Sequence, residues 1–269
     1  MSLSIAGKTA IVTGAANGIG LAIARHFIDK GANVMFVDMD EARLEAEVGE
    51  EARADGPVQM FSGDLRQKLT IANLLSATMD AFGRVDILVN ASRQMAVSDP
   101  LCPEDDAVEL LLQQNFLTSL RVSQMTAKRM ILQAEKAGDE SRNIGVIINL
   151  SSIAAHHTQG ALLGYSVACA ALDQMTRSLA VALAGKGIRV NAVAFGSVMS
   201  ASLQGLLKEN PGYRAAITDG TPLHRIAGPD ELVETVQFLA SDAAAFITGQ
   251  IITVDGGRSL IDPVNAPAH

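Results

Sequence analysis

The chain has 269 residues, of which 48% are apolar and 19% charged, and its formal net charge is −8. This length lies near the upper limit for one α/β domain with one core, so we expect a single domain over 1–269. Nucleic acid is an unfavourable partner, because a phosphate backbone needs a positive surface and the chain has no cluster of Lys and Arg. No apolar run reaches the roughly 18 residues that cross a bilayer, so we expect no membrane span.

The N-terminal segment and the cysteines bear on the compartment. The start MSLSIAGKTA leads directly into a candidate strand, without the charged and then apolar segment of a secretory signal, which predicts a cytoplasmic protein. Cys102 and Cys169 are too few for a disulfide framework and have no close Cys or His at metal-ligand spacing. We therefore expect free thiols and no metal site.

Short runs rich in β-branched residues alternate with amphipathic helical patterns along the chain. The candidate strands are 9–13, 33–38, 58–62, 85–90, 145–150, 189–194 and 250–254. The candidate helices are 18–30, 40–53, 66–82, 104–136, 164–186 and 229–241. This alternation predicts a doubly wound α/β Rossmann sandwich, with a seven-stranded parallel sheet, right-handed crossovers and helices on both faces.

Two stretches fit no simple β-α unit. The polar stretch 133–143 is interpreted as a surface extension of the fourth helix and its loop. The stretch 197–223 is interpreted as an excursion that covers the substrate, and four of its apolar residues have helical spacing. A lid, a subunit contact and plain core are all compatible with these four, which are Met199, Leu203, Leu206 and Leu207.

The first candidate strand runs into the glycine-rich segment Gly14-Ala15-Ala16-Asn17-Gly18-Ile19-Gly20, which opens a helix. A Cβ at Gly14 or Gly18 would block a tight turn and keep backbone N–H groups away from a pyrophosphate at the positive helix end. Three glycines alone fit an ordinary βα turn as well. Their place at the end of the first strand of a βαβ unit favours a dinucleotide site.

Asp38 ends the second candidate strand, about 20 residues beyond the glycines. A carboxylate at this position accepts hydrogen bonds from the adenosine ribose hydroxyls and repels a 2′-phosphate. Position 17 holds Asn17 rather than a cation. The sequence therefore predicts NAD, and not NADP, as the cofactor.

With these motifs in order, the chain resembles the short-chain dehydrogenase/reductase family from Gly7 to Gly257. The segment Thr13 to Gly20 resembles the family's cofactor turn, and Gly63-Asp64-Leu65 resembles the segment whose Asp meets the adenine ring. Tyr165 follows Ser152 by 13 residues, the family's distance between its catalytic serine and tyrosine. Further similar positions are Asn90 after the fourth strand, Asn115 in the fourth helix, Ile247 to Gln250 and Val254 to Gly257.

The resemblance implies an oxidoreductase that transfers a hydride between NAD and an alcohol or ketone. It implies that Ser152 polarises the substrate oxygen, that Tyr165 is the acid and base, and that Asn115 helps hold a proton-relay water. The cofactor residues that it implies are Gly14, Asn17, Gly18, Ile19, Gly20, Asp38, Asp64, Leu65, Asn90 and Gly196.

The chain departs from the family where the nicotinamide is expected. The family's lysine, four residues after the tyrosine, is replaced by Cys169, and a neutral thiol cannot stabilise a phenolate. The family's Asn-Asn-Ala-Gly becomes Asn90-Ala91-Ser92-Arg93, and its Pro-Gly becomes Phe195-Gly196. Two functions are compatible with this pattern: an enzyme of reduced activity, or an NAD-binding pseudoenzyme with a regulatory or structural role.

Three hypotheses apply to Arg93, where the family has glycine. Its guanidinium replaces the missing positive charge near Tyr165, or blocks the nicotinamide site, or points to solvent. Cys169 itself is most simply a packing residue. His156 and His157 follow Ser152 on a loop, where a substrate contact and plain solvation are both open.

The helices 104–136 and 164–186 carry more apolar positions than one sheet face can cover. The family pairs these helices across a two-fold axis, so a homo-oligomer is expected, a tetramer or a dimer. The identity of the small-molecule substrate depends on the loop 153–163 and the excursion 197–223, which no motif constrains.

Overall fold

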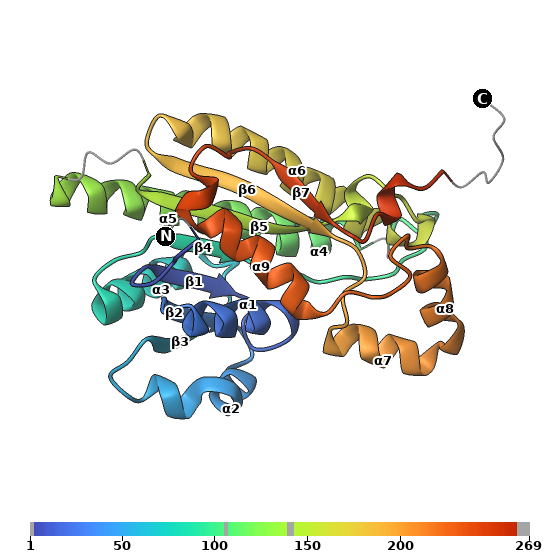
Figure 1. Ribbon diagram of the computed structural model, residues 1–269, viewed down its shortest axis with the longest axis horizontal. Coiled ribbons are helices and arrows are strands. Elements are labelled where there is room, and N and C mark those ends of the chain that lie inside the picture. Colours follow the sequence, from blue (N-terminus) through green and yellow to red (C-terminus); the bar gives the residue numbers. More distant parts are fainter. Residues whose placement is uncertain (1–2, 105–106, 139–142, 263–269) are drawn as a thin grey trace.

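Seven parallel strands form one sheet in the computed structural model, which describes residues 3–104, 107–138 and 143–262 (Figure 1). The strand order is β3-β2-β1-β4-β5-β6-β7, so the direction of winding reverses between β1 and β4. The strands are β1 (Thr9–Thr13), β2 (Asn33–Asp38), β3 (Val58–Ser62), β4 (Ile87–Asn90), β5 (Gly145–Ser152), β6 (Ile188–Phe195) and β7 (Ile251–Val254). The doubly wound fold is confirmed, with strand ends moved by at most two residues.

Helices cover both faces of the sheet. They are α1 (Gly18–Asp29), α2 (Glu41–Ala52), α3 (Lys68–Phe82), α4 (Val108–Leu111), α5 (Thr118–Ala137), α6 (Leu163–Ala184), α7 (Ala201–Glu209), α8 (Pro211–Asp219) and α9 (Pro229–Ala240). One core lies under α1, α2 and α9, and the other under α3, α5 and α6. Every residue of β1, β4, β5 and β6 is buried, as expected for parallel strands covered on both faces.

The fourth helix differs from its prediction as one continuous helix over 104–136. Glu104 lies in a turn, the helix begins at Val108, and a π-helical segment spans Leu112–Leu117 between α4 and α5. Asn115 sits in this segment, and its side-chain amide forms two hydrogen bonds of 2.8 Å with the backbone of Gln94. The widened turn brings the amide to that loop, and such π-bulges are frequent at functional sites.

The two stretches outside the β-α pattern are partly helical. The helix part of 133–143 ends at Ala137, where Gly138 takes a left-handed φ of +63°, and 139–142 lie outside the described residues. The excursion after β6 contains α7 and α8, which lie beyond the carboxyl ends of the strands (Figure 1). Leu207 is buried there, and Leu203 and Leu206 are half-buried.

The segment Gly160–Ala184, which includes α6, is long and apolar enough to cross a membrane by length and composition. In this fold it is a core helix, because one side of it, between Gly164 and Ala180, is buried and packs against β5, β6 and the π-helical segment. Asp173, a buried carboxylate in its middle, would be costly in lipid.

Candidate functional site

The glycine turn after β1 packs too closely to admit side chains at Gly14 and Gly20, whereas the expected clash at Gly18 is wrong, because a Cβ there would have nothing within 4 Å. A Cβ on Gly14, whose φ is +68°, would lie 2.7 Å from Cα of Ser92, and one on Gly20 would lie 2.1 Å from the Gly14 carbonyl oxygen. Gly18 has a φ of +56° and starts α1, whose first turn has no acidic residue and no side-chain cap. The turn therefore leaves free N–H groups at a positive helix end, which fits a pyrophosphate.

Asp38 stands at the rim of this turn, at the carboxyl end of β2. Its Oδ2 accepts a hydrogen bond from the Ala16 N–H at 3.2 Å, and its Oδ1 accepts one from the Asp40 N–H at 3.1 Å. These bonds hold the carboxylate beside the turn. A small cleft runs from here past β3 to the loop after β4, and its lining includes Gly14, Asp38, Met39, Asp64, Arg66 and Ser92.

A second carboxylate in this cleft, Asp64, is already bound by a cation. Arg66 donates from Nε and Nη2 to the two Asp64 oxygens at 2.8 to 3.0 Å. The hydrogen bond from Arg66 holds the pKa of Asp64 below its ordinary value. Any contact of Asp64 with an adenine ring would therefore include Arg66, a residue that the sequence analysis did not single out.

The remaining candidate cofactor residues lie around the same edge of the sheet. Asn17 is exposed beside the turn, Ile19 is half-buried, and Leu65 is buried below the cleft. Gly196 follows β6 and leaves little room for a side chain, because a Cβ would lie 3.0 Å from Cβ of Asp255. The glycine turn, Asp38 and Gly196 thus border one edge, the carboxyl ends of the strands, where open α/β sheets bind ligands.

Asn90 turns its side chain into the core rather than into the cleft. Its amide donates to Oγ of Ser123 at 2.9 Å and to Oδ1 of Asn149 at 2.8 Å, and Asn149 donates to Oγ1 of Thr176 at 2.8 Å. All four residues are buried. This network ties β4 to β5, α5 and α6 through the Nδ2 group of Asn90, and a cofactor contact of Asn90 stays a prediction.

Ser152 and Tyr165 meet where β5 ends and α6 begins. Ser152 pairs with Phe195 as the last residues of β5 and β6, and its Oγ accepts a hydrogen bond from the Ala154 N–H at 3.2 Å. Tyr165 lies in the first turn of α6 and is almost fully buried. Burial raises the pKa of its phenol, while Arg93 and a hydrogen bond with Ser152 act in the opposite direction.

Arg93 reaches into this centre from the loop after β4. Its Nη1 donates a hydrogen bond to the Tyr165 hydroxyl at 2.7 Å and lies 3.5 Å from the Ser151 carbonyl oxygen. The guanidinium carbon lies 4.1 Å from the centre of the Phe195 ring. Arg93 is an exposed residue, but its guanidinium contacts Tyr165 and Phe195 and so does not point only to solvent.

Cys169 lies one helical turn after Tyr165, on the same side of α6. Its side chain is buried, and burial raises the pKa of the thiol to about 11, so the thiol is neutral at physiological pH. Together with Leu111, Ala154, Tyr165 and Ala168, it forms a small apolar cluster. Cys169 therefore packs against the centre and provides no charge.

Asn115 holds the loop that carries Arg93. Its Oδ1 accepts from the Gln94 N–H, and its Nδ2 donates to the Gln94 carbonyl. Its own backbone carbonyl accepts from the Ser119 hydroxyl at 2.9 Å. The side chain thus fixes the backbone next to Arg93; a role in holding a relay water stays a prediction.

The loop after β5 places one of its two histidines against a buried acid. His156 Nε2 lies 3.4 Å from Oδ2 of Asp173, and the side chains are 59% and 1% exposed, respectively. Burial raises the pKa of Asp173. His156 is thus partly held in place, while His157 is exposed.

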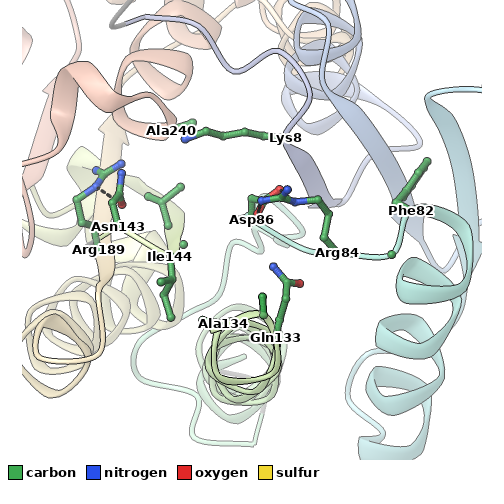
Figure 2. A pocket seen from close by; sticks show the side chains of 14 residues that line it. Lys8, Phe82, Arg84, Asp86, Gln133, Ala134, Asn143, Ile144, Arg189 and Ala240 are labelled. Atoms are coloured by element: carbon green, nitrogen blue, oxygen red, sulfur yellow. Dashed lines mark hydrogen bonds and ion pairs between the residues drawn. The ribbon is translucent and has the colours of Figure 1, made fainter. Parts of the chain in front are cut away.

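A cavity of about 370 Å³ lies at the opposite edge of the sheet, near the amino ends of β5 and β6 (Figure 2). Its charged side chains have partners: Lys8 contacts Asp242 at 3.2 Å, and Arg84 contacts Asp86 at 2.8 Å. Arg189 donates to backbone carbonyls of the loops before β7. Among the described residues, no group of three or more His, Cys, Asp or Glu is arranged to hold a metal ion.

Comparison with known proteins identifies close relatives along the whole chain. The family described as enoyl-(acyl carrier protein) reductase matches residues 14–259. The cis-4-hydroxycyclohexanecarboxylate dehydrogenase of Sinomonas cyclohexanicum is 33% identical over 262 residues, which cover 97% of this chain and 100% of the relative. The 3-oxoacyl-[acyl-carrier-protein] reductase FabG of Thermotoga maritima is 30% identical over 255 residues, covering 95% and 99%.

A solved structure adds a ligand-bound relative. The 7α-hydroxysteroid dehydrogenase complexed with NADH and 7-oxo glycochenodeoxycholic acid superposes with a TM-score of 0.85 at 29% identity, covering 95% of this chain and 96% of that chain. The relatives are thus dehydrogenases and reductases, and one of them binds NADH.

Proposed function

Since the chain belongs to the short-chain dehydrogenase/reductase family and is an oxidoreductase that uses a nicotinamide cofactor, we propose that it interconverts a secondary alcohol and a ketone with NAD. The observation that carries this proposal is the meeting of the Ser152 and Tyr165 hydroxyls at the carboxyl edge of the sheet, the edge that also holds the glycine turn. Gly14, Gly18 and Asp38 would hold the cofactor.

A bound nicotinamide supplies or accepts the hydride. Ser152 donates a hydrogen bond to the substrate oxygen, and Tyr165 exchanges a proton with the same oxygen. In ketone reduction the phenol gives its proton to that oxygen, and in alcohol oxidation the phenolate takes it. Because burial raises the pKa of Tyr165, the phenol is protonated at neutral pH. Reduction is therefore supported at neutral pH, and oxidation accelerates as the pH rises.

The names of two relatives point to a substrate class. One relative is named for a hydroxycyclohexane carboxylate and another for a hydroxysteroid, so we propose a secondary alcohol on a ring as the substrate. The test is a panel of cyclic ketones with NADH at neutral pH, and of the matching alcohols with NAD at alkaline pH, followed by NADH absorbance. NADH binding without turnover on any member would instead support the pseudoenzyme.

The preference for NAD is proposed to come from Asp38. Its carboxylate, fixed by the Ala16 and Asp40 N–H groups, would repel a 2′-phosphate by a few kcal/mol, or on the order of 100-fold in affinity. NAD is expected to bind more tightly than NADP, and Asp38→Ala to remove most of the difference. Calorimetric titration measures both constants, with Asp55→Ala as a control for the loss of one exposed negative charge. Tighter binding of NADP to the unchanged protein would contradict the assignment.

We further propose that the protein is a homo-oligomer, a tetramer or a dimer, through the outer faces of α5 and α6. Val181 of α6 is 84% exposed, and Val167 of α6 and Leu132 of α5 are also exposed, an apolar set that association would cover. Light scattering at micromolar concentration is expected to give a multiple of the chain mass, and Val181→Glu to reduce it. A monomeric unchanged protein would contradict the proposal.

A further inference from the structure

We propose that Arg93 is a catalytic residue, which provides the positive charge at the Tyr165 hydroxyl and turns its hydrogen toward the substrate. This inference rests on the proposed function, because it concerns how the same phenol exchanges its proton.

The hydrogen bond between the two side chains has a fixed direction. A guanidinium has only donors, so at 2.7 Å the Nη1 of Arg93 donates and the Tyr165 oxygen accepts. The phenolic hydrogen cannot point back at Arg93 and is free to be donated elsewhere. In ketone reduction this hydrogen moves to the substrate oxygen, and the negative charge that stays on the phenolate faces a permanent cation.

The charges around the phenol make Arg93 the group that can stabilise a phenolate. Burial has the largest effect on the pKa of Tyr165 and raises it. Of the effects that lower this pKa, the charge of Arg93 is the largest. The Cys169 thiol one turn away is neutral, because burial raises its pKa to about 11, and it provides no positive charge. Farther along the same helix, Asp173 is acidic and pairs with His156, so the positive charge in contact with the phenol is that of Arg93.

An aromatic contact and the fixed backbone of the next residue hold the Arg93 side chain in this position. The guanidinium stacks on Phe195, 4.1 Å from the ring centre, and is 5.9 Å from the centre of the Tyr165 ring. The next residue of the loop, Gln94, is clamped through its backbone by Asn115. Asn115 is thus a positioning residue for Arg93, and Phe195 provides the surface on which the guanidinium lies.

The phenol can be followed directly, without turnover. The chain has two tyrosines and no tryptophan, and the second tyrosine, Tyr213, is exposed on α8. In a Tyr213→Phe background, the ultraviolet absorbance of tyrosinate as a function of pH reports Tyr165 alone. We expect Arg93→Gln to move this titration to higher pH and Arg93→Lys to move it less. Arg53→Gln, which removes an exposed charge just after the end of α2, is the control and is expected to leave the titration of Tyr165 in place.

Two further measurements separate the possible outcomes. For Arg93→Gln we expect ketone reduction to slow by about 10- to 100-fold, with circular dichroism and NADH affinity little changed. The inference would be overturned if Arg93→Gln left the titration of Tyr165 unmoved. It would also be overturned if Arg93→Gln tightened NADH binding and sped up turnover, since Arg93 would then obstruct the nicotinamide site. If the titration moves but the unchanged protein turns over no substrate, the contact is supported and the proposed function fails.

Discussion

Replacing Tyr165 by Phe is expected to lower turnover by about 100- to 10,000-fold, the range of general acid–base catalysis. The substitution removes one oxygen, the atom to which Arg93 donates a hydrogen bond at 2.7 Å. The chain has one other phenol, that of Tyr213, whose side chain is exposed on α8. The rate constant for ketone reduction with saturating NADH measures the loss.

The control is Ser76→Ala, which deletes one exposed hydroxyl on α3, outside the centre and the excursion, and is expected to keep full turnover. NADH affinity, followed by fluorescence, is expected to change little in Tyr165→Phe, because the adenosine side of the cleft is unaltered. If Tyr165→Phe kept more than about a tenth of the rate, the phenol would not be the acid.

Placing a methyl group on Gly20 is expected to lower NAD affinity by about 100-fold or more, which corresponds to about 2.7 kcal/mol. The Cβ of Gly20→Ala would lie 2.1 Å from the Gly14 carbonyl oxygen, a backbone atom of the turn. Either α1 or the turn must move, and the N–H groups that face a pyrophosphate move with them. Calorimetric titration with NAD measures the change.

Gly56→Ala is the control for this substitution, because nothing lies within 4 Å of its added Cβ and its φ is not in the left-handed range. It is expected to bind NAD as the unchanged protein does. A Gly20→Ala variant that is folded by circular dichroism and binds NAD normally would show that the cofactor does not use this turn.

The sheet was predictable because its strands are buried on both faces and so appear as continuous apolar runs such as Val34 to Val37. The π-helical segment was not, because it depends on Asn115 reaching Gln94, and a hydrophobic repeat carries no information on such a bond. The same limit applies to Asn90, whose position after β4 indicated a cofactor contact, while its amide joins a buried network.

The contacts around Tyr165 were likewise predictable only in part. The resemblance to the family implied that Ser152 and Tyr165 meet, because their separation of 13 residues is the family's distance between its catalytic serine and tyrosine. Arg93 is 72 residues from Tyr165, so its hydrogen bond follows from the folded arrangement of β4 and α6 and no local pattern encodes it. Arg66 forms an ion pair with Asp64, and the separation of two residues could by itself have suggested this pair.

The central claim is that this chain transfers hydride between a secondary alcohol and NAD at the Ser152–Tyr165 centre. Its most direct test uses cyclic alcohols that carry deuterium on the carbinol carbon, incubated with NAD at alkaline pH, with mass spectrometry of the reduced cofactor. We predict deuterium in the cofactor with the unchanged protein and none above background with Tyr165→Phe. Tight NAD binding without deuterium transfer from any alcohol of the panel would contradict the claim and leave a protein that binds the cofactor for another purpose.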